Sequence, residues 1–319
     1  MTCKPCGRVR MLGTRRNLCK AVTTAMLVTL FLGSFLVSPT PPKSPRTADE
    51  EEVRIVCWAV TAPKYHETRS RAVKETWARH CDQHFFVSTK PDTYLGTLVV
   101  NVTENYWMLW GKTRAAIRHA YENYREAGQW FIKADDDTFV IVENLKNMLK
   151  LYDHRKPLYF GNKFQMKNIS QGFMGGGAGY VLSRAAVKLL VEKGFPNKTA
   201  CHPGPKGRED VELGKCLEAV GVVAGDSRDH LGRDRFMSFT PDLLQERGAL
   251  SRVGHSWFWT LVYYPTSEGP LCCSDTAVTF HYVSPAMMRA LYYLVYVLRL
   301  ARPHDPAPLL PPSLNASLS

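Results

Sequence analysis

Acidic residues are missing from the start of this 319-residue chain, and that absence locates much of its positive charge. The first twenty residues hold six Lys or Arg and no Asp or Glu, so half of the formal charge of +12 lies in that segment. A basic balance concentrated in a short tail does not indicate a nucleic-acid-binding surface, so no nucleic-acid partner is predicted.

Charge of either sign is absent from Ala21–Ser38, AVTTAMLVTLFLGSFLVS. An uncharged apolar run of this length after basic residues predicts a transmembrane signal anchor, with residues 1–20 as a cytosolic tail and all later residues in the lumen. The short span suits an early secretory membrane, so we expect a single-pass type II protein of the Golgi or early secretory pathway. A cleaved signal peptide is the alternative, but the run is long for one and no clear A-x-A site follows it.

Apolar residues are sparse in Pro39–Glu52, PTPPKSPRTADEEE, where proline and charge prevent a packed core. This segment is predicted to be a short stem that holds a globular domain, residues 53–301, away from the membrane. Residues 302–319 contain no motif that we can match, and they are predicted to form a disordered C-terminal tail.

A CxxC pair is absent from the six cysteines that follow the apolar run, which argues against a zinc site and favours disulfides in an oxidising compartment. These cysteines are Cys57, Cys81, Cys201, Cys216, Cys272 and Cys273. Of the many pairings they allow, only Cys57 with Cys81 is predicted here. Lumenal exposure would also make four sequons available for N-glycosylation, at Asn101, Asn168, Asn197 and Asn315.

Strand and helix patterns alternate over the first hundred residues of the globular part, with no internal repeat. Strands are expected at Val53–Val60, His84–Ser88, Thr97–Val102 and the run that begins at Gln129; helices are expected around Val73, at Asn105–Ala127 and at Ile141–Leu151. This alternation predicts an α/β fold with one Rossmann-like, mostly parallel sheet and helices on both faces. Beyond Lys156 the pattern is less regular, with helices expected at Ser183–Lys193, Glu209–Val220 and Leu291–Leu300.

Three consecutive carboxylates, Asp135, Asp136 and Asp137, follow the apolar residues of the strand QWFIKADDD. If the extended backbone continues through them, Asp135 and Asp137 face one way and Asp136 the other. Two carboxylates on one side of a strand end suit Mg²⁺ or Mn²⁺, ions that often share their coordination with phosphate oxygens. A solvated acidic turn is the alternative. An EF-hand is excluded, since its sixth position would be Val140 and its twelfth Lys146.

Four further stretches contain candidate functional residues, and each also has a purely structural explanation. Gln171–Ser183 holds five glycines in eight residues and fits neither phosphate-loop template. Its backbone either approaches a bulky, flat or sugar-like ligand closely or forms a structural turn. Glu209 and Asp210 begin a predicted helix, where acids also stabilise the helix dipole. His281 lies between aromatic residues, as a core histidine or a metal ligand. The aromatic cluster at 257–264 could stack on sugar rings or pack the core.

Taken together, these stretches resemble the β1,3-glycosyltransferase family, whose members share four short elements in the same order. They read here Arg71–Trp77 (RAVKETW), Lys133–Asp137 (KADDD), Gly176–Tyr180 (GGAGY) and Glu209–Val211 (EDV). Two C-terminal elements are similar to those of its core 1 galactosyltransferases, namely GDSRD at Gly225–Asp229 and CCSDTAVTFHYV at Cys272–Val283. The resemblance covers roughly Val53 to Arg299.

The resemblance implies a GT-A fold and an inverting transfer of galactose from UDP-galactose to the 3-hydroxyl of GalNAc α-linked to Ser or Thr of a glycoprotein. It implies Mn²⁺ as the cofactor and Asp210 as the catalytic base. It assigns the metal to Asp135, Asp137 and His281, and binding of the cofactor and donor to Asp135, Asp136, Lys133 and Trp77. A homodimer and a dedicated chaperone are further partners that it suggests.

Two alternatives remain open within the same resemblance. A related chaperone of the transferase keeps the fold and the CCSD element but has lost the aspartate triplet, whereas this chain keeps both DDD and EDV. A family member with another UDP-sugar donor, such as UDP-GlcNAc, would share all of the general elements. The galactosyl prediction depends on the C-terminal elements alone.

Overall fold

The computed structural model describes residues 52–301. The predicted cytosolic tail, membrane span and C-terminal tail, almost all of the stem and the sequon at Asn315 lie outside the described residues. Within residues 52–301, every helix is too short or too polar to cross a bilayer.

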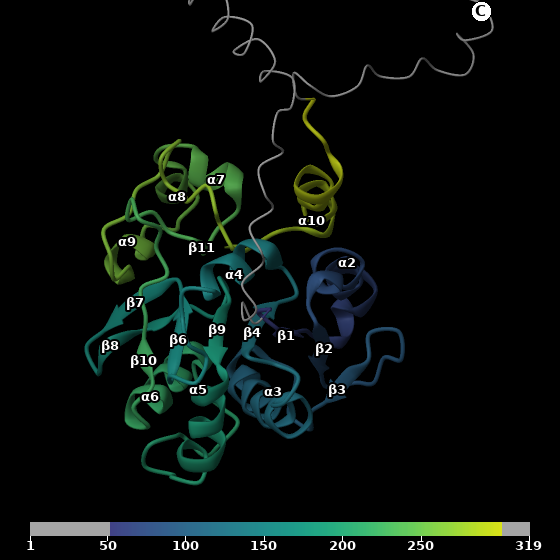
Figure 1. Cartoon of the computed structure of the whole chain (residues 1–319), viewed down its shortest axis with the longest axis vertical. Helices are drawn as coiled ribbons and strands as arrows, with labels where there is room; N and C mark the ends of the chain where they lie inside the picture. The colour runs from purple at the N-terminus through teal and green to yellow at the C-terminus, as the bar shows by residue number, and fades with distance from the viewer. Residues whose placement is uncertain (1–51, 302–319) are drawn as a thin grey trace, which may run out of the picture. The chain divides into compact units, whose positions relative to one another are not determined.

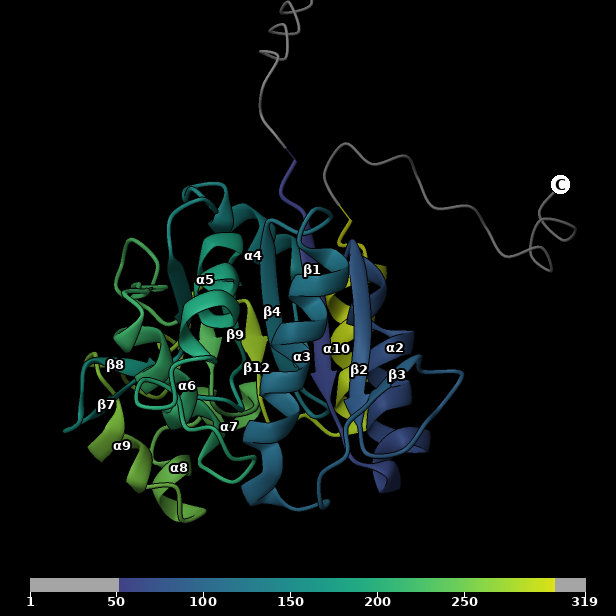
Figure 2. The ribbon, with the colours of Figure 1, turned by 90° about the horizontal axis from the view of Figure 1, so that it is seen from below.

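A seven-stranded sheet forms the centre of the described chain, in the order β10-β6-β9-β4-β1-β2-β3 (Figures 1 and 2). Its strands are β1 (Ile55–Val60), β2 (Gln83–Ser88), β3 (Thr97–Val99), β4 (Trp130–Asp135), β6 (Leu158–Gly161), β9 (Tyr180–Ser183) and β10 (Val223–Ala224). Only β9 runs against its neighbours, so the sheet is mixed and mostly parallel, as predicted. The expected α/β class with a large mixed sheet is confirmed.

Helices cover both faces of this sheet, and Figure 2 shows α3 and α10 on opposite sides of it. One face packs against α2 (Arg71–Glu75), α4 (Val142–Leu149) and α10 (Pro285–Tyr292). The other packs against α3 (Leu109–Tyr124), α5 (Arg184–Leu189) and α6 (Glu209–Ala219). Alternate residues of β1 serve the two faces, because Ile55 and Cys57 pack into the first core while Val56 and Trp58 pack into the second.

Six shorter helical turns connect or extend these elements. They are η1 (Pro63–Tyr65), η2 (His66–Ser70), η3 (Trp77–His80), η4 (Tyr106–Met108), η5 (Leu190–Gly194) and η6 (Tyr293–Val297). The C-terminal helix predicted at Leu291–Leu300 therefore begins earlier, at Pro285, and its helical turns end at Val297. Tyr292 and Tyr296 pack against the core, which confirms the expected docking of this helix.

Two small sheets correct the expectation of one sheet. They are a three-stranded sheet in the order β11-β12-β5 and the hairpin β7-β8. Their strands are β5 (Phe139–Val140), β7 (Lys163–Met166), β8 (Ile169–Met174), β11 (Phe236–Met237) and β12 (Thr279–Phe280). The helices α7 (Pro241–Gln245), α8 (Ala249–Arg252) and α9 (Trp257–Leu261) complete this part. A third apolar cluster, around Phe164, Phe239 and Phe258, holds it together.

The reversed direction of β9 has a direct effect on the site described below. Tyr180, the first residue of β9, pairs with Lys133 near the end of β4. The glycine-rich turn that leads into β9 therefore lies beside the aspartate triplet instead of at the opposite edge of the sheet.

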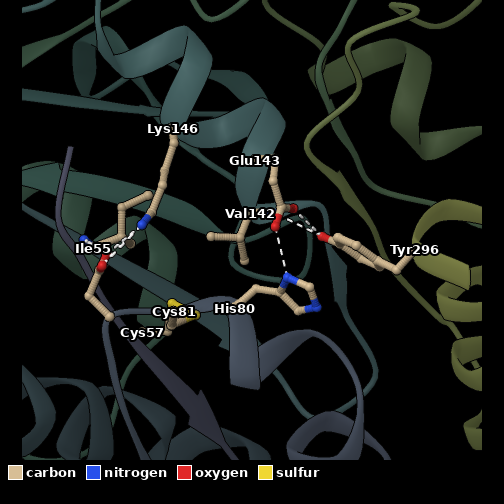
Figure 3. The surroundings of a disulfide bond; sticks show 9 residues. Ile55, Cys57, His80, Cys81, Val142, Glu143, Lys146 and Tyr296 are labelled. Carbon is tan, nitrogen blue, oxygen red and sulfur yellow. Dashed lines mark hydrogen bonds and ion pairs between the residues drawn. A yellow bond between two sulfur atoms is a disulfide. The ribbon is translucent and has the colours of Figure 1, made fainter. Parts of the chain in front are cut away.

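Three disulfides join the six described cysteines in sequence order. Cys57–Cys81 ties β1 to the residue after η3, as predicted, and Figure 3 shows His80 beside it, in contact with Glu143. Cys201–Cys216 fastens the segment before α6 to that helix, and Cys272–Cys273 closes a ring between adjacent residues. Disulfides at all six positions exclude these cysteines as zinc ligands.

Candidate active site

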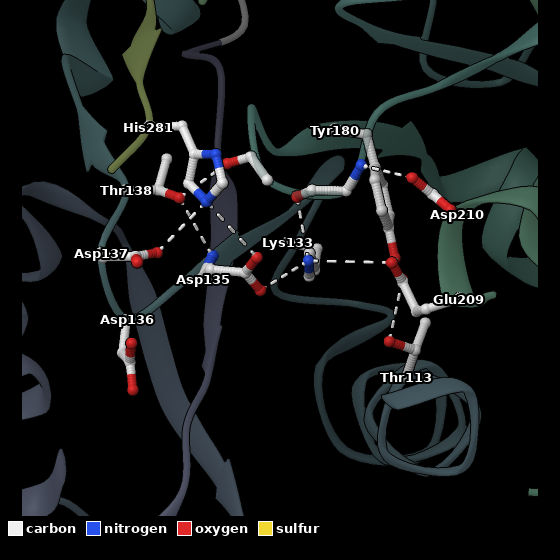
Figure 4. A network of polar contacts seen from close by, with 12 residues as sticks. Thr113, Lys133, Asp135, Asp136, Asp137, Thr138, Tyr180, Glu209, Asp210 and His281 are labelled. Carbon is white, nitrogen blue, oxygen red and sulfur yellow. Dashed lines mark hydrogen bonds and ion pairs between the residues drawn. The ribbon is translucent and has the colours of Figure 1, made fainter. Parts of the chain in front are cut away.

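The aspartate triplet lies where β4 ends. The strand stops at Asp135, and the next two residues form a turn, so the extended backbone does not continue through the triplet. The side chains nevertheless separate as expected, because Asp135 and Asp137 point toward His281 while Asp136 points away (Figure 4).

Asp135, Asp137 and His281 bring three potential ligand atoms within 4.8 Å of one another. The Nε2 atom of His281 lies 3.3 Å from Asp137 Oδ1 and 4.0 Å from Asp135 Oδ2. Although burial opposes it, the hydrogen bond with His281 and the electrostatic interactions with His281 and Arg69 lower the pKa of Asp137. Two carboxylates and an imidazole form a donor set that fits Mn²⁺, so these residues suit a divalent metal site.

Backbone pairing brings His281 to the triplet from the far end of the chain. It follows β12, which lies between β11 and β5 in the small sheet, and its N–H donates to the carbonyl of Met237. Two residues later, the N–H of Val283 donates to the carbonyl of Asp137, 2.8 Å away. Strand pairing on one side of His281 and this hydrogen bond on the other fix the imidazole beside the carboxylates.

The glycine-rich turn is close-packed against these side chains. A Cβ atom at Gly177 would lie 2.2 Å from the His281 ring, and one at Gly176 would lie 2.7 Å from Glu209 Oε2. This packing gives the glycines a structural reason, because the turn passes directly against the side chains of His281 and Glu209. The Oγ1 atom of Thr138 fixes the turn further by donating to the carbonyl of Gly177.

Asp136 points away from Asp137 and His281, and its expected role in donor binding stays a prediction. Its carboxylate is buried, accepts a 2.7 Å hydrogen bond from Thr61 Oγ1 and contacts Arg69. Burial raises its pKa to about 6 despite the hydrogen bond from Thr61. Arg69 also donates to Asp137 Oδ2 at 2.9 Å, so this arginine, which the sequence motifs did not single out, joins the two neighbouring carboxylates.

Two other residues that were expected to bind the donor are enclosed by protein. Trp77 is 1% exposed and packs in the apolar core, so we correct its assignment from cofactor binding to core packing. Lys133 is 2% exposed, and its ammonium contacts Asp135, Glu209 and the carbonyl of Gly176. Its contacts are with the protein's own site residues rather than with a ligand space.

Asp210 lies in the first turn of α6, on the other side of the glycine-rich turn. One carboxylate oxygen accepts from the N–H of Gly176 at 3.2 Å, and the other accepts from the N–H of Val211 at 2.9 Å. The carboxylate is only half-buried, in contrast to the adjacent Glu209. Burial is the largest cause that raises the pKa of the Tyr106 phenol, and the nearby Asp210 raises it further. An ionisable, accessible carboxylate beside a metal-type cluster suits a general base.

A second arrangement has the order of a hydrolytic triad. His66 Nε2 lies 2.7 Å from Ser88 Oγ, and His66 Nδ1 lies 3.3 Å from Asp92 Oδ2. Ser88 is completely buried at the end of β2, so no substrate carbonyl could reach its oxygen. We therefore assign these three residues to the structure of the loop after β2.

The aromatic residues at 257–264 divide between the two explanations offered by the sequence. Phe258 is buried in the third apolar cluster, where it packs edge-on against Phe164 and Phe239. Trp257 and Tyr263 are 43% and 39% exposed, so parts of their rings remain open to solvent. The cluster is thus a core with an exposed aromatic edge.

The sequence of the domain matches one family model, described as Fringe-like, over residues 52–261. This chain belongs to the Fringe-like family. The chain is also 41% identical over 252 residues to glycoprotein-N-acetylgalactosamine 3-beta-galactosyltransferase 1 of Xenopus laevis, with 78% of this chain and 68% of that protein aligned. The alignment supports the resemblance inferred from the motifs.

Other proteins match this Fringe-like protein over shorter stretches of sequence or with low structural similarity. A human beta-1,3-glucosyltransferase is 26% identical over 164 residues, which cover 51% of this chain and 32% of that protein. A solved galactosyltransferase in complex with donor and acceptor sugar analogs gives a TM-score of 0.39 at 10% identity, covering 77% of this chain and 97% of the other. Family membership rests on the family model and the Xenopus relative.

Proposed function

We propose that this Fringe-like protein is an inverting, metal-dependent galactosyltransferase that moves galactose from UDP-galactose to the 3-hydroxyl of GalNAc on Ser or Thr of glycoproteins. The observation that carries the proposal is the juxtaposition of the Asp135–Asp137–His281 cluster with the accessible Asp210 on either side of one glycine-rich turn. Galactose and the N-acetylgalactosamine acceptor are taken from the name of the Xenopus relative, and the UDP-linked donor from the family resemblance.

Asp135, Asp137 and His281 would hold Mn²⁺, which supplies a Lewis acid for the charge that develops on departing UDP. Inversion at the anomeric carbon needs a carboxylate that removes the proton of the attacking hydroxyl. Asp210 performs that task, and the proton of the acceptor 3-hydroxyl passes to its carboxylate as the new bond forms. The N–H groups of Gly176 and Val211 donate to its two carboxylate oxygens and fix its direction.

The proposed setting is the lumen of the Golgi or early secretory pathway, with residues 21–38 as a single type II anchor. The disulfides among the described residues support an oxidising compartment. Asn101, Asn168 and Asn197 are exposed, as N-glycosylation requires. The homodimer and the dedicated chaperone stay predictions.

The test is a transfer assay with UDP-galactose and a GalNAc-peptide, using folded, full-length protein. We expect transfer that EDTA abolishes and Mn²⁺ restores, and none from Asp137→Ala. A folded preparation without transfer would contradict the enzyme and favour the chaperone alternative. A parallel panel of UDP-sugars decides the donor, and preference for UDP-GlcNAc or UDP-glucose would contradict the galactosyl assignment.

A further inference from the structure

A buried lysine joins the two halves of the proposed active site. The Nζ atom of Lys133 lies 2.7 Å from Asp135 Oδ1 and 3.8 Å from Glu209 Oε2, and it donates to the carbonyl of Gly176 at 2.9 Å (Figure 4). The Lys133 ammonium is therefore held by three groups at once.

Glu209 is the buried partner of this lysine on the Asp210 side. Its Oε1 atom accepts from Tyr180 at 2.6 Å and from Thr113 at 2.9 Å, while Oε2 faces Lys133. These contacts come from β9, α3 and β4, so Glu209 fixes the first turn of α6 to three other elements. Its neighbour Asp210 is carried by the same turn.

Gly176 connects the two sides through a single residue. Its carbonyl accepts from Lys133, and its N–H donates to Asp210 Oδ2. Lys133 thus contacts the metal-type carboxylate Asp135 directly and reaches Asp210 by two routes, through Gly176 and through Glu209. A displacement of the ammonium would move both groups.

We propose that Lys133 and Glu209 are positioning residues that hold Asp135 and Asp210 at a fixed separation across the glycine-rich turn. This inference rests on the proposed function for the role of Asp210. Lys133 acts on both sides of the turn, whereas Glu209 acts on the Asp210 side. The two residues should therefore give different signatures when they are replaced.

Lys133→Met tests the metal side without relying on catalysis. Removing a nearby positive charge by itself would strengthen Mn²⁺ binding, because like charges repel. Loss of positioning has the opposite sign, and we expect Mn²⁺ affinity, measured by electron paramagnetic resonance, to fall about tenfold, which is about 1.4 kcal/mol. Unchanged or stronger Mn²⁺ binding in the folded variant would overturn the proposal. Lys133→Gln, which keeps an N–H donor without the charge, replaces it if Lys133→Met does not fold.

Glu209→Gln tests the base side by separating kcat from KM. The amide keeps the size of the side chain and an oxygen for Tyr180 and Thr113, but it loses the charge that pairs with Lys133. We expect kcat to fall about tenfold to a hundredfold while the KM for UDP-galactose changes less than about threefold, since positioning a base affects the chemical step. A kcat equal to that of the wild type would overturn the role of Glu209. A KM for UDP-galactose that rises by the same factor as kcat falls would overturn it as well.

Lys163→Met is the matched control. Lys163 is also buried, and its ammonium donates to the carbonyl of Ala224 at 3.1 Å, away from the carboxylates of the site. We expect this variant to lose stability but to keep wild-type Mn²⁺ affinity and kcat. A wild type that binds Mn²⁺ without any transfer would refute the proposed function alone, because the metal measurement still decides the role of Lys133.

Discussion

Two clusters of carboxylates in this molecule differ in how their charge is balanced. In the loop of Asp226 and Asp229, each carboxylate has an arginine of its own: Arg228 contacts Asp226 at 2.8 Å, and Arg233 contacts Asp229 at 2.7 Å. In the aspartate triplet, Asp135 and Asp137 instead converge on one another and on His281. Arg69 is shared between Asp136 and Asp137, and Lys133 between Asp135 and Glu209.

This difference in charge balance distinguishes carboxylates that stabilise the fold from carboxylates suited to binding a ligand. Both clusters belong to motifs that resemble the same family. In the GDSRD loop, however, each carboxylate already forms an ion pair with a nearby arginine. In the triplet, Asp135 and Asp137 keep partly exposed side chains and share too little positive charge, which a divalent cation can supply. We infer that the carboxylates paired one to one with arginines stabilise the fold, and we propose that those left short of positive charge bind the metal ion.

Outside the metal cluster, the largest effect on transfer is expected from Asp210→Asn. The amide keeps the shape but cannot accept a proton, so transfer should fall by about 10²–10⁴-fold. UDP and Mn²⁺ binding, measured by calorimetry, should stay close to the wild type because Asp210 lies outside the metal cluster. A fully active variant would refute Asp210 as the base.

His281→Ala should weaken Mn²⁺ binding by about a hundredfold, or about 2.7 kcal/mol, because one of the three proposed protein ligands is lost. Asp229→Asn, in the arginine-balanced cluster, should leave Mn²⁺ affinity unchanged. Titration of both variants by electron paramagnetic resonance sharpens the comparison. Equal losses in the two variants would show that the ion binds without using the triplet site.

Gly177→Ala should reduce Mn²⁺ affinity by about tenfold, since the added methyl group would displace the His281 ring. The check is a double-mutant cycle with His281→Ala. Without the imidazole there is nothing for the methyl group to displace, so the second substitution should add little. Additive losses would mean that Gly177 acts through the backbone instead.

The smallest effect concerns stability in the arginine-balanced cluster. Although burial opposes it, hydrogen bonds from the backbone of Arg233, from Ser274 and from the Arg233 guanidinium lower the pKa of Asp229 to about 2. A lowered carboxyl pKa stabilises the fold above the unfolded value of 3.8, and this contribution is lost as the pH falls toward about 2.

Asp229→Asn should therefore cost about 1–2 kcal/mol at pH 7, and the difference from the wild type should shrink as the pH falls below about 4. Urea unfolding at several pH values measures it. A difference that stays constant with pH would assign the loss to packing rather than to the charge of Asp229.

Much of the sheet could be predicted because its strands are apolar runs and its helices have regular periods. Strands β1, β2 and β4 and helices α3 and α6 lie where the sequence placed them, apart from residues at their ends. Strands β5, β10, β11 and β12 are each two residues long, so they carry no periodic pattern. Their pairing depends on contacts between distant segments, which a single sequence does not reveal.

Within the candidate site, the potential metal ligands were easier to predict than the residues that position them. Asp135, Asp137 and His281 come together as expected. Trp77 was misassigned because a motif residue can belong to the core as well as to the site. Arg69 lies two residues before the RAVKETW element, and no spacing in the sequence links it to the triplet.

The position of β12 sets the order in which the site can be completed during synthesis. The ribosome releases Asp135 and Asp137 long before His281, and that histidine reaches them only when β12 enters between β11 and β5. Until then the carboxylates face one another without their imidazole partner. A product that stops at residue 261, where the family match ends, would retain the triplet and Asp210 but lack β12 and the third ligand. The most C-terminal strand of the described residues thus supplies the last component of the candidate metal site.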